Sequence, residues 1–200
     1  RCCLIVNQEV SLFLRVFLIS QRRNNAYKLA LGGCPLIKDD HSLFNQSYAP
    51  FKDRVKACVD SVNNANAKTG GRSLYIANCT ADSMEFLERA MTAQELGAGG
   101  IMAAPGLLGL SIIRELSSAL DFHLPIFLHP CFSGPLVLSA DSGVSPFCCY
   151  GQFSRLAGAD AAIFTSFGGR FPFTEEVCRK ICDGTETEMG GLRSIFPVPS

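Results

Sequence analysis

The chain has 200 residues, of which 48% are hydrophobic, and it carries 18 basic and 18 acidic residues. This composition predicts a globular protein with a substantial core, forming one domain or part of a larger one, and argues against disorder. The zero net charge argues against a nucleic acid or an anionic membrane as a partner, although a few placed groups can still hold a small anion.

The first 24 residues do not share the pattern of the rest. They are largely apolar, but polar and charged residues interrupt them, so they fit poorly to a membrane span or a cleavable signal peptide. A signal anchor is the alternative, because two arginines follow the apolar run. We expect residues 1–24 to be a divergent or mis-joined segment. Since the chain does not begin with Met and ends in mid-pattern, we expect it to be a fragment.

From residue 25 onward, apolar segments alternate with segments of helical periodicity. The expected strands are 34–37, 73–78, 101–104, 125–128, 161–164 and 194–198. The expected helices are 25–31, 51–67, 81–96, 108–120, 144–157 and 174–182, with Asp82 and Thr174 as N-caps of two of them. This alternation predicts an α/β fold with a parallel sheet. Because no glycine-rich dinucleotide fingerprint is present, we expect a partial (β/α)8 TIM barrel of about six βα units, with its first and last strands missing.

The ten cysteines occur singly or as adjacent pairs, and none of them forms a CxxC motif. With only three histidines in the chain, a zinc site is poorly supported. Most of the cysteines lie in apolar runs, where a thiol packs as a small core residue. Cys178 and Cys182, one helical turn apart, are expected to pack in the same way. We therefore predict reduced cysteines and a cytoplasmic location.

A charged cluster follows the first of these strands. Lys38, Asp39, Asp40 and His41 come directly after the apolar run 35–37. In a barrel, catalytic groups lie at the C-terminal ends of the strands. A lysine there can act as a base, form a Schiff base, or react with carbon dioxide to give a carbamate, whose oxygens would join Asp40 in binding Mg²⁺. The alternative is a solvated Lys–Asp pair.

The same argument selects further polar residues at strand ends: Asn78, Cys79, Thr80, His129, Thr165, Ser166 and Ser200. For His129, the alternative is a histidine that is hydrogen-bonded to a neighbouring backbone carbonyl. Arg170 follows two glycines, in a loop that could close a cation over a substrate, or it is a surface arginine in a plain turn. Ser200 lies where the usual phosphate site of a barrel begins.

Six motifs occur in a fixed order over residues 25–200: GGCPLIKDDH, NQSYAPFKDRV, AQELGAGGIM, FLHP, RLAGADAAIF and FPVPS. Together they resemble the barrel domain of the RuBisCO large subunit, and most closely that of the form IV RuBisCO-like proteins. The resemblance implies that residues 25–200 are part of a C-terminal barrel domain. It also implies that the full-length parent is a homodimer, located in the cytoplasm or in a plastid, and that the fragment alone is inactive.

The resemblance implies a metal site. It places Lys38 on the lysine that carbon dioxide converts to a carbamate, and Asp40 on a magnesium-binding aspartate. His41 stands where the family has its second magnesium carboxylate. Because nitrogen suits Mg²⁺ less well than oxygen does, His41 would shift the preferred ion from Mg²⁺ toward Mn²⁺ or Zn²⁺.

The resemblance also implies substrate contacts, and here the chain departs from true RuBisCO. His129 falls on a substrate-binding histidine, and Ser200 opens a phosphate-binding loop. Arg170 replaces the lysine of the mobile loop and cannot readily exchange a proton. Pro130 replaces an arginine that contacts phosphate, and Ile163 replaces a histidine. We therefore do not expect carboxylation of ribulose bisphosphate.

These observations predict that the parent is a RuBisCO-like lyase or isomerase acting on a keto-sugar phosphate. Enolisation, isomerisation or decarboxylation would proceed through a metal-stabilised enediolate. Lys38, His129 and Arg170 would be catalytic, while His129, Arg170 and Ser200 would bind the substrate. Methionine salvage and the breakdown of four-carbon or branched sugar acids are the candidate pathways, and the departures favour the second. The alternatives are a true carboxylase and a non-catalytic barrel that binds a phosphorylated metabolite or a partner subunit.

Overall fold

The computed structural model describes residues 11–14, 18–139, 141–169 and 173–200. The chain forms two compact units. The N-terminal unit contains the described residues up to Met102, together with Phe122–Leu124. The C-terminal unit contains Ala103–Asp121 and Pro125–Ser200.

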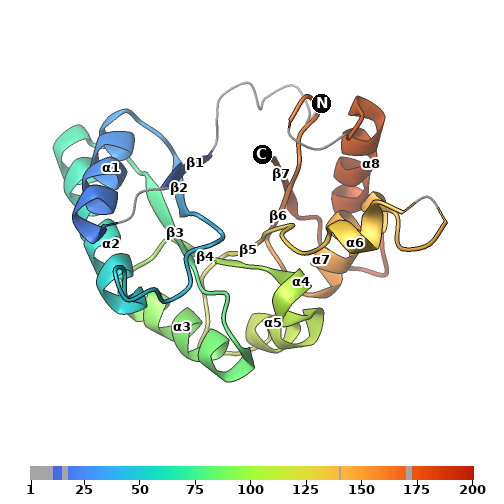
Figure 1. Cartoon of the computed structure of the whole chain (residues 1–200), viewed down its shortest axis with the longest axis horizontal. Helices are drawn as coiled ribbons and strands as arrows, with labels where there is room; N and C mark the ends of the chain where they lie inside the picture. Colours follow the sequence, from blue (N-terminus) through green and yellow to red (C-terminus); the bar gives the residue numbers. More distant parts are fainter. Residues whose placement is uncertain (1–10, 15–17, 140, 170–172) are drawn as a thin grey trace. The chain divides into compact units, whose positions relative to one another are not determined.

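The N-terminal unit is a series of strand–helix repeats (Figure 1). Its elements are β1 (Ser11–Leu14), α1 (Ile19–Leu31), β2 (Leu36–Asp39), α2 (Phe51–Thr69), β3 (Leu74–Asn78), α3 (Ser83–Glu95) and β4 (Gly100–Ala103). The strands are parallel, and each pairs with the next one along the chain. Nearly all residues of β2, β3 and β4 are buried, as expected for parallel strands that are covered on both faces.

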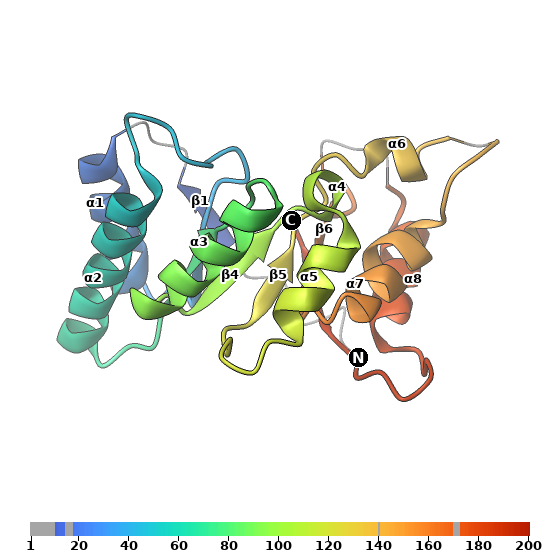
Figure 2. The same ribbon diagram turned by 90° about the horizontal axis from the view of Figure 1, so that it is seen from below.

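The C-terminal unit continues the same alternation with shorter helices (Figure 2). Its elements are α4 (Pro105–Leu108), α5 (Leu110–Ser117), β5 (Ile126–Leu128), α6 (Gly134–Val137), the π-helix η2 (Phe147–Gln152), α7 (Phe153–Leu156), β6 (Ala161–Phe164), α8 (Glu175–Glu186) and β7 (Phe196–Pro199). Strands β5, β6 and β7 are parallel and pair in chain order. Tyr150, Phe164, Phe173 and Ile181 form a buried cluster in this unit.

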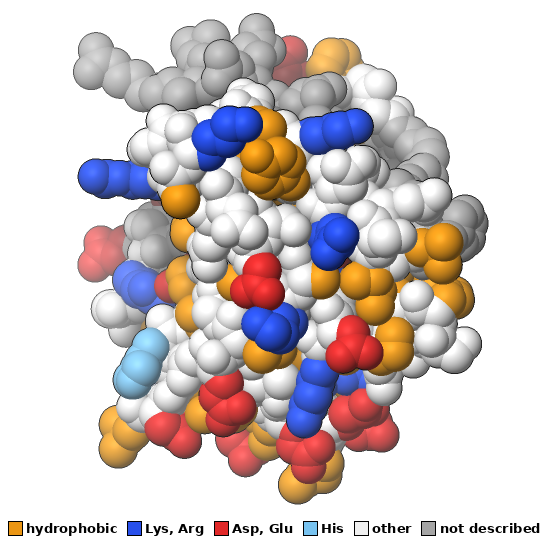
Figure 3. All heavy atoms as spheres, turned by 90° about the vertical axis from the view of Figure 1, so that its left-hand side faces the viewer, with side chains coloured by type: hydrophobic (Ala, Val, Ile, Leu, Met, Phe, Trp, Pro, Cys, Tyr) orange, Lys and Arg blue, Asp and Glu red, His pale blue; other side chains and the backbone are white. Residues whose placement is uncertain are grey.

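The surface and the cysteines agree with the composition. On the face that carries α1 and α2, basic, acidic and hydrophobic side chains are interspersed (Figure 3). The eight cysteines in the described ranges are free thiols, and Cys178 and Cys182 pack against the buried cluster, as predicted. Among the described residues, no helix combines the length and the apolar character needed to cross a lipid bilayer.

The α/β class and the partial (β/α)8 barrel are confirmed, because parallel strands alternate with helices in both units. The two predicted N-caps are also confirmed. The Asp82 side chain accepts a hydrogen bond from the Glu85 backbone N–H at 3.1 Å, and Thr174 accepts one from the Val177 N–H at 3.2 Å. These bonds satisfy backbone donors that the first helical turn leaves unpaired.

Four segments differ from the sequence-based expectations. A strand, β1, lies within the segment for which no strand was predicted, and it pairs with β2. The strand expected at 34–37 is Leu36–Asp39, so it includes the first two charged residues. The helix expected at 108–120 is divided at Gly109, whose φ of 78° is a left-handed value that ends α4. The helix expected at 144–157 begins at Phe147 and contains a π-helix.

Candidate functional site

The charged cluster predicted from the sequence lies at the C-terminal end of β2, in the N-terminal unit. Lys38 and Asp39 belong to the strand itself, and Asp40 and His41 follow it. Lys38 is 3% exposed and its Nζ donates to the backbone oxygen of Asp39 at 3.2 Å. Asp40 is 6% exposed. These exposures do not fit the alternative of a solvated Lys–Asp pair.

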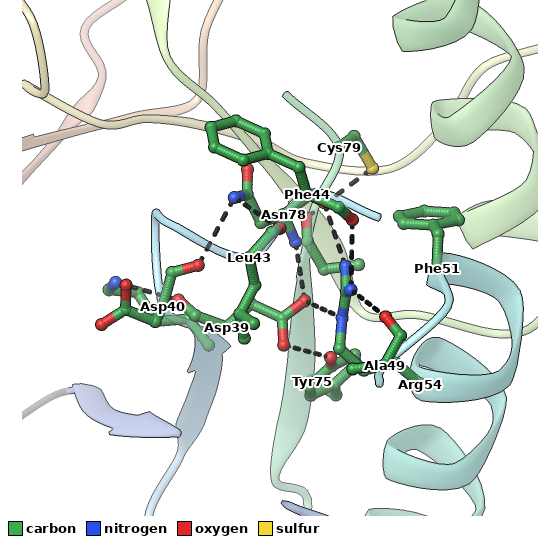
Figure 4. A network of polar contacts seen from close by, with 12 residues as sticks. Asp39, Asp40, Leu43, Phe44, Ala49, Phe51, Arg54, Tyr75, Asn78 and Cys79 are labelled. Carbon is green, nitrogen blue, oxygen red and sulfur yellow. Dashed lines mark hydrogen bonds and ion pairs between the residues drawn. The ribbon is translucent and has the colours of Figure 1, made fainter. Parts of the chain in front are cut away.

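Asp39 is the centre of a buried hydrogen-bond network (Figure 4). Its Oδ1 accepts from the Tyr75 hydroxyl at 2.6 Å. Its Oδ2 accepts from Arg54 Nε at 3.1 Å and from the Asn78 backbone N–H at 3.1 Å. Both carboxylate oxygens of Asp39 are therefore engaged inside the protein, in contacts that join β2 to β3 and α2.

Arg54 was not selected from the sequence, although it is a main member of this network. It lies on α2, is 0% exposed and forms a buried ion pair with Asp39. Burial, the largest single effect, acts to lower the pKa of Arg54, but the interactions with Asp39 and Tyr75 together outweigh it, so this pKa lies above its usual value. The guanidinium group also lies over the Phe51 ring, 5.3 Å from the ring centroid. Its spacing from Phe51 and Val55 marks it as part of the buried helix face, which is the signal that could have identified it.

Asp40 is held as an anion by its neighbours. Its Oδ1 accepts hydrogen bonds from the backbone N–H of Ser42 at 2.9 Å and from the Ser42 hydroxyl at 2.7 Å. Burial, the largest single effect, acts to raise the pKa of Asp40, and these two bonds act in the opposite direction. The nearby charges of His41 and Lys38 add to the lowering. The net result is that the pKa of Asp40 lies below its usual value.

His41 extends the polar group on the same loop. Its Nδ1 lies 3.7 Å from Asp40 Oδ1, and about a third of its side chain is exposed. Asp40 and His41 thus present one carboxylate and one imidazole close together. Within the described ranges, no group of three His, Cys, Asp or Glu side chains is arranged to hold a metal ion. A three-ligand metal site at this position therefore requires a further oxygen donor, which a carbamate on Lys38 would provide.

His129 lies in the C-terminal unit, directly after β5. Its backbone N–H donates to Ala103 O at 2.8 Å, and its Nδ1 accepts from the Cys131 backbone N–H at 3.1 Å. An imidazole that accepts at Nδ1 while neutral carries its proton on Nε2. His129 is nearly buried, and it lines a small cavity of about 70 Å³. The rest of that lining is mostly apolar and includes Leu128, Pro130 and Phe153.

The remaining candidates lie at the ends of β6 and β7. The Ser166 backbone N–H and hydroxyl both donate to the backbone oxygen of Ser200, at 3.0 and 3.1 Å. This places Ser200 beside the beginning of the loop that follows β6, and β7 ends one residue before it. Ile163 lies within β6, where it is buried and lines the same cavity as His129. Arg170 lies outside the described residues.

Comparison with known proteins gives a consistent result. Residues 20–183 match the family model described as the ribulose bisphosphate carboxylase large chain, catalytic domain. The chain is 34% identical over 179 residues to a 5-methylthioribulose-1-phosphate isomerase from Rhodospirillum rubrum, covering 88% of this chain and 45% of the relative. It is 36% identical over 173 residues to a 2,3-diketo-5-methylthiopentyl-1-phosphate enolase from Geobacillus thermodenitrificans, covering 86% and 42%. The chain thus spans less than half the length of these two relatives.

Solved structures show the same likeness. A RuBisCO-like protein from Alicyclobacillus acidocaldarius superposes with a TM-score of 0.88 at 30% identity, covering 98% of this chain and 50% of the other. A RuBisCO-like protein from Rhodopseudomonas palustris gives a TM-score of 0.87 at 30% identity, covering 95% and 53%.

Proposed function

The chain belongs to the ribulose bisphosphate carboxylase large-chain family, and from this premise we propose that its full-length parent is a RuBisCO-like enzyme acting on a keto-sugar phosphate. The observation that carries the proposal is the end of β2, where the buried Lys38 precedes Asp40, a carboxylate with a lowered pKa. Reaction with carbon dioxide would convert the Lys38 amine into a carbamate, whose oxygens could bind a cation together with the Asp40 carboxylate. The reaction would be an enolisation or isomerisation at the carbon next to a ketone.

In this proposal the residues have separate roles. Lys38, as its carbamate, would bind a divalent cation together with Asp40 and His41, and Mn²⁺ would compete well with Mg²⁺ because of the imidazole ligand. A cation held there would supply stabilisation of the negative charge that develops on the substrate oxygens. His129 would donate a hydrogen bond from Nε2 to a substrate oxygen, and Ser200 would contribute to the phosphate site. Arg170 would place its cation over the bound substrate.

Two positions in the sequence argue against a true carboxylase. Carboxylation in this family needs phosphate contacts and a loop lysine, and the chain has Pro130 and Arg170 at those positions. The relatives at 34% and 36% identity are named as an isomerase and an enolase. We therefore set the carboxylase alternative aside.

For the substrate, we propose a pentulose phosphate with an apolar substituent, such as a methylthio group. The cavity beside His129 has an apolar lining, which suits a thioether better than a second phosphate. The names of the two relatives contain 5-methylthioribulose 1-phosphate and 2,3-diketo-5-methylthiopentyl 1-phosphate, which both carry a methylthio group. Of the two candidate pathways, these observations favour methionine salvage over the breakdown of sugar acids. We also propose that the parent is a homodimer, which mass photometry can check.

The second candidate function is a non-catalytic barrel that binds a phosphorylated metabolite or a partner subunit. It is favoured by one observation: among the described residues, no third His, Cys, Asp or Glu side chain joins Asp40 and His41 to complete a metal site. The two functions differ in their dependence on Lys38, because only the enzyme needs the carbamate.

Solvent-deuterium exchange tests the proposal directly. The full-length parent is incubated in deuterium oxide with keto-pentose phosphates, bicarbonate and Mg²⁺ or Mn²⁺, and incorporation is followed by mass spectrometry. We expect exchange next to the ketone, and a loss of at least about 100-fold in Lys38→Ala because a metal ligand is removed. Lys56→Ala, an exposed lysine on α2 paired with Asp60, is the matched control and should exchange normally. No exchange with any candidate substrate would favour the binding protein.

A further inference from the structure

The amide side chain of Asn78 holds the backbone of the segment that carries the proposed metal ligands. Asn78 is fully buried at the end of β3. Its Nδ2 lies 3.0 Å from the backbone oxygen of His41 and 3.0 Å from that of Leu43, with the oxygen of Asp40 at 3.4 Å. Its Oδ1 accepts from the Thr80 backbone N–H at 3.1 Å. Both ends of the amide are therefore engaged, which fixes its orientation.

This segment, residues 40–49, is here named the β2–α2 loop. Arg54 bonds to backbone oxygens further along the same loop. Its NH1 group donates to the backbone oxygens of Phe44 at 3.1 Å and Ala49 at 3.2 Å. The ion pair with Asp39 fixes the guanidinium group in this position. In Figure 4 dashed lines join the Asn78 amide, at the end of β3, and the Arg54 guanidinium group, on α2, to backbone oxygens of the loop.

The Asn78 and Arg54 side chains provide hydrogen-bond donors for backbone carbonyls of the β2–α2 loop. Buried backbone carbonyls need hydrogen-bond donors, and the backbone of this loop supplies part of them, from Leu43 N–H to Asp40 O and from Ala49 N–H to Gln46 O. Two side chains from β3 and α2 supply donors to carbonyls along the loop, and those of Asn78 go to the loop's N-terminal half. That half contains Asp40 and His41, whose Oδ1 and Nδ1 atoms lie 3.7 Å apart.

We propose that Asn78 is a positioning residue of the metal site: it fixes the backbone of Asp40 and His41, so that their side chains meet a divalent cation without rearrangement of the loop. This inference rests on the proposed function, because it takes these two residues as ligands. Outer partners that orient ligands in this way typically change metal affinity by about 10–100-fold when they are removed.

The test compares Asn78→Ala with Asn66→Ala. Asn66 is a matched control, because its side chain also makes two hydrogen bonds to backbone, donating to Ser73 O at 2.8 Å and accepting from Ser73 N at 2.9 Å. The Asn66 bonds are made to Ser73, just before the start of β3, whereas Asn78 is the last residue of that strand. Two quantities are measured: the affinity for Mn²⁺, by electron paramagnetic resonance in bicarbonate buffer, and hydrogen exchange of residues 40–49 in the metal-free protein.

We expect Asn78→Ala to weaken Mn²⁺ binding about 10–100-fold and to speed exchange in residues 40–49. Asn66→Ala should lower the melting temperature to a similar degree and leave both quantities unchanged. If Asn78→Ala does not fold, Asn78→Ser keeps one donor and should give a smaller change in the same direction.

Three outcomes count against the proposals, and they are distinct. Unchanged exchange and unchanged Mn²⁺ affinity in Asn78→Ala overturn the positioning role. Equal losses in Asn66→Ala also overturn it, because the effect is then a general loss of stability. A wild-type protein that binds no Mn²⁺ overturns the metal site of the proposed function, and exchange in residues 40–49 then decides by itself whether Asn78 fixes the loop.

Discussion

The Asp39–Arg54 pair shows how one buried charge determines the role of another. Phe51, Arg54, Val55 and Cys58 share the buried face of α2, so the guanidinium group is placed inside the protein by the helical repeat. A buried cation needs an anion and further acceptors, and Asp39 supplies the anion from β2. The two adjacent aspartates therefore differ: the Asp39 carboxylate pairs with the buried Arg54, whereas the Asp40 carboxylate bonds to Ser42 in the loop and is the one we propose as a metal ligand.

Asp39→Asn should therefore be strongly destabilising. The amide keeps the size of the side chain but leaves the buried guanidinium group without its anion, which costs about 3–5 kcal/mol in such pairs. Urea denaturation of Asp39→Asn and of a control variant measures this loss in the free energy of unfolding. Asp60→Asn is the control, since it removes an exposed partner of Lys56 at 3.0 Å, and such pairs contribute about 0–1 kcal/mol. Equal losses in the two variants would show that the Asp39–Arg54 pair does not stabilise the fold.

At this scale, some residue roles could be read from the sequence and others could not. The caps Asp82 and Thr174 were predictable, because an N-cap depends only on a side chain and the helix that directly follows it. The role of Asn78 was not, because it depends on carbonyls more than 30 positions away in the sequence. Its place at a strand end was predicted, but its partners follow only from how β2 and β3 pair.

The elements differ from the predictions where tertiary contacts override local preference. Charged residues usually end a strand, yet β2 continues through Lys38 and Asp39. It does so because Lys38 is in register with Ile76 of β3 and because Arg54 neutralises Asp39. The division of helix 108–120 at Gly109 has a local cause, since glycine adopts a left-handed φ without steric cost.

The packing of η2 against α8 requires glycine at the crossing. A Cβ added at Gly151 would lie 2.6 Å from the carbonyl carbon of Gly184, a backbone atom that cannot move aside. Gly151→Ala should therefore destabilise the protein by about 1–3 kcal/mol, as overpacking does. Gly134→Ala is the control, because its Cβ would meet only the end of the Leu138 side chain at 3.4 Å. Thermal unfolding of both variants checks the difference, and a Gly151→Ala protein as stable as the control would contradict this packing.

At the scale of the whole molecule, the alternation of strands and helices was enough to predict the class, and the ordered motifs were enough to indicate the family. Neither could show that Lys38 is buried. Its burial depends on its neighbours across the sheet, since it is in register with residues of both β1 and β3. The strand β1 was not expected, so the surroundings of Lys38 could not be predicted correctly.

The proposed metal site makes a prediction for the stability of the whole chain. A ligand that binds only the folded state stabilises it by about 2.7 kcal/mol at 100 times its Kd. For a chain of this size, that corresponds to a rise in melting temperature of roughly 5–10 °C. We expect such a rise with Mn²⁺ or Mg²⁺, and we expect it to depend on added bicarbonate, because the proposed third ligand is a carbamate on Lys38. Removing the cation with a chelator should reverse it.

Two lysine variants connect this stabilisation to one side chain. Lys38→Ala should abolish the dependence on bicarbonate, because no amine remains to react with carbon dioxide, and only Asp40 and His41 would be left to bind the ion. Lys56→Ala should behave as the wild-type chain does, since this exposed lysine lies on α2 in a surface pair. Melting curves with and without bicarbonate measure the effect. A shift in Lys38→Ala that still follows bicarbonate would place the carbamate on another residue and exclude Lys38 as the metal ligand.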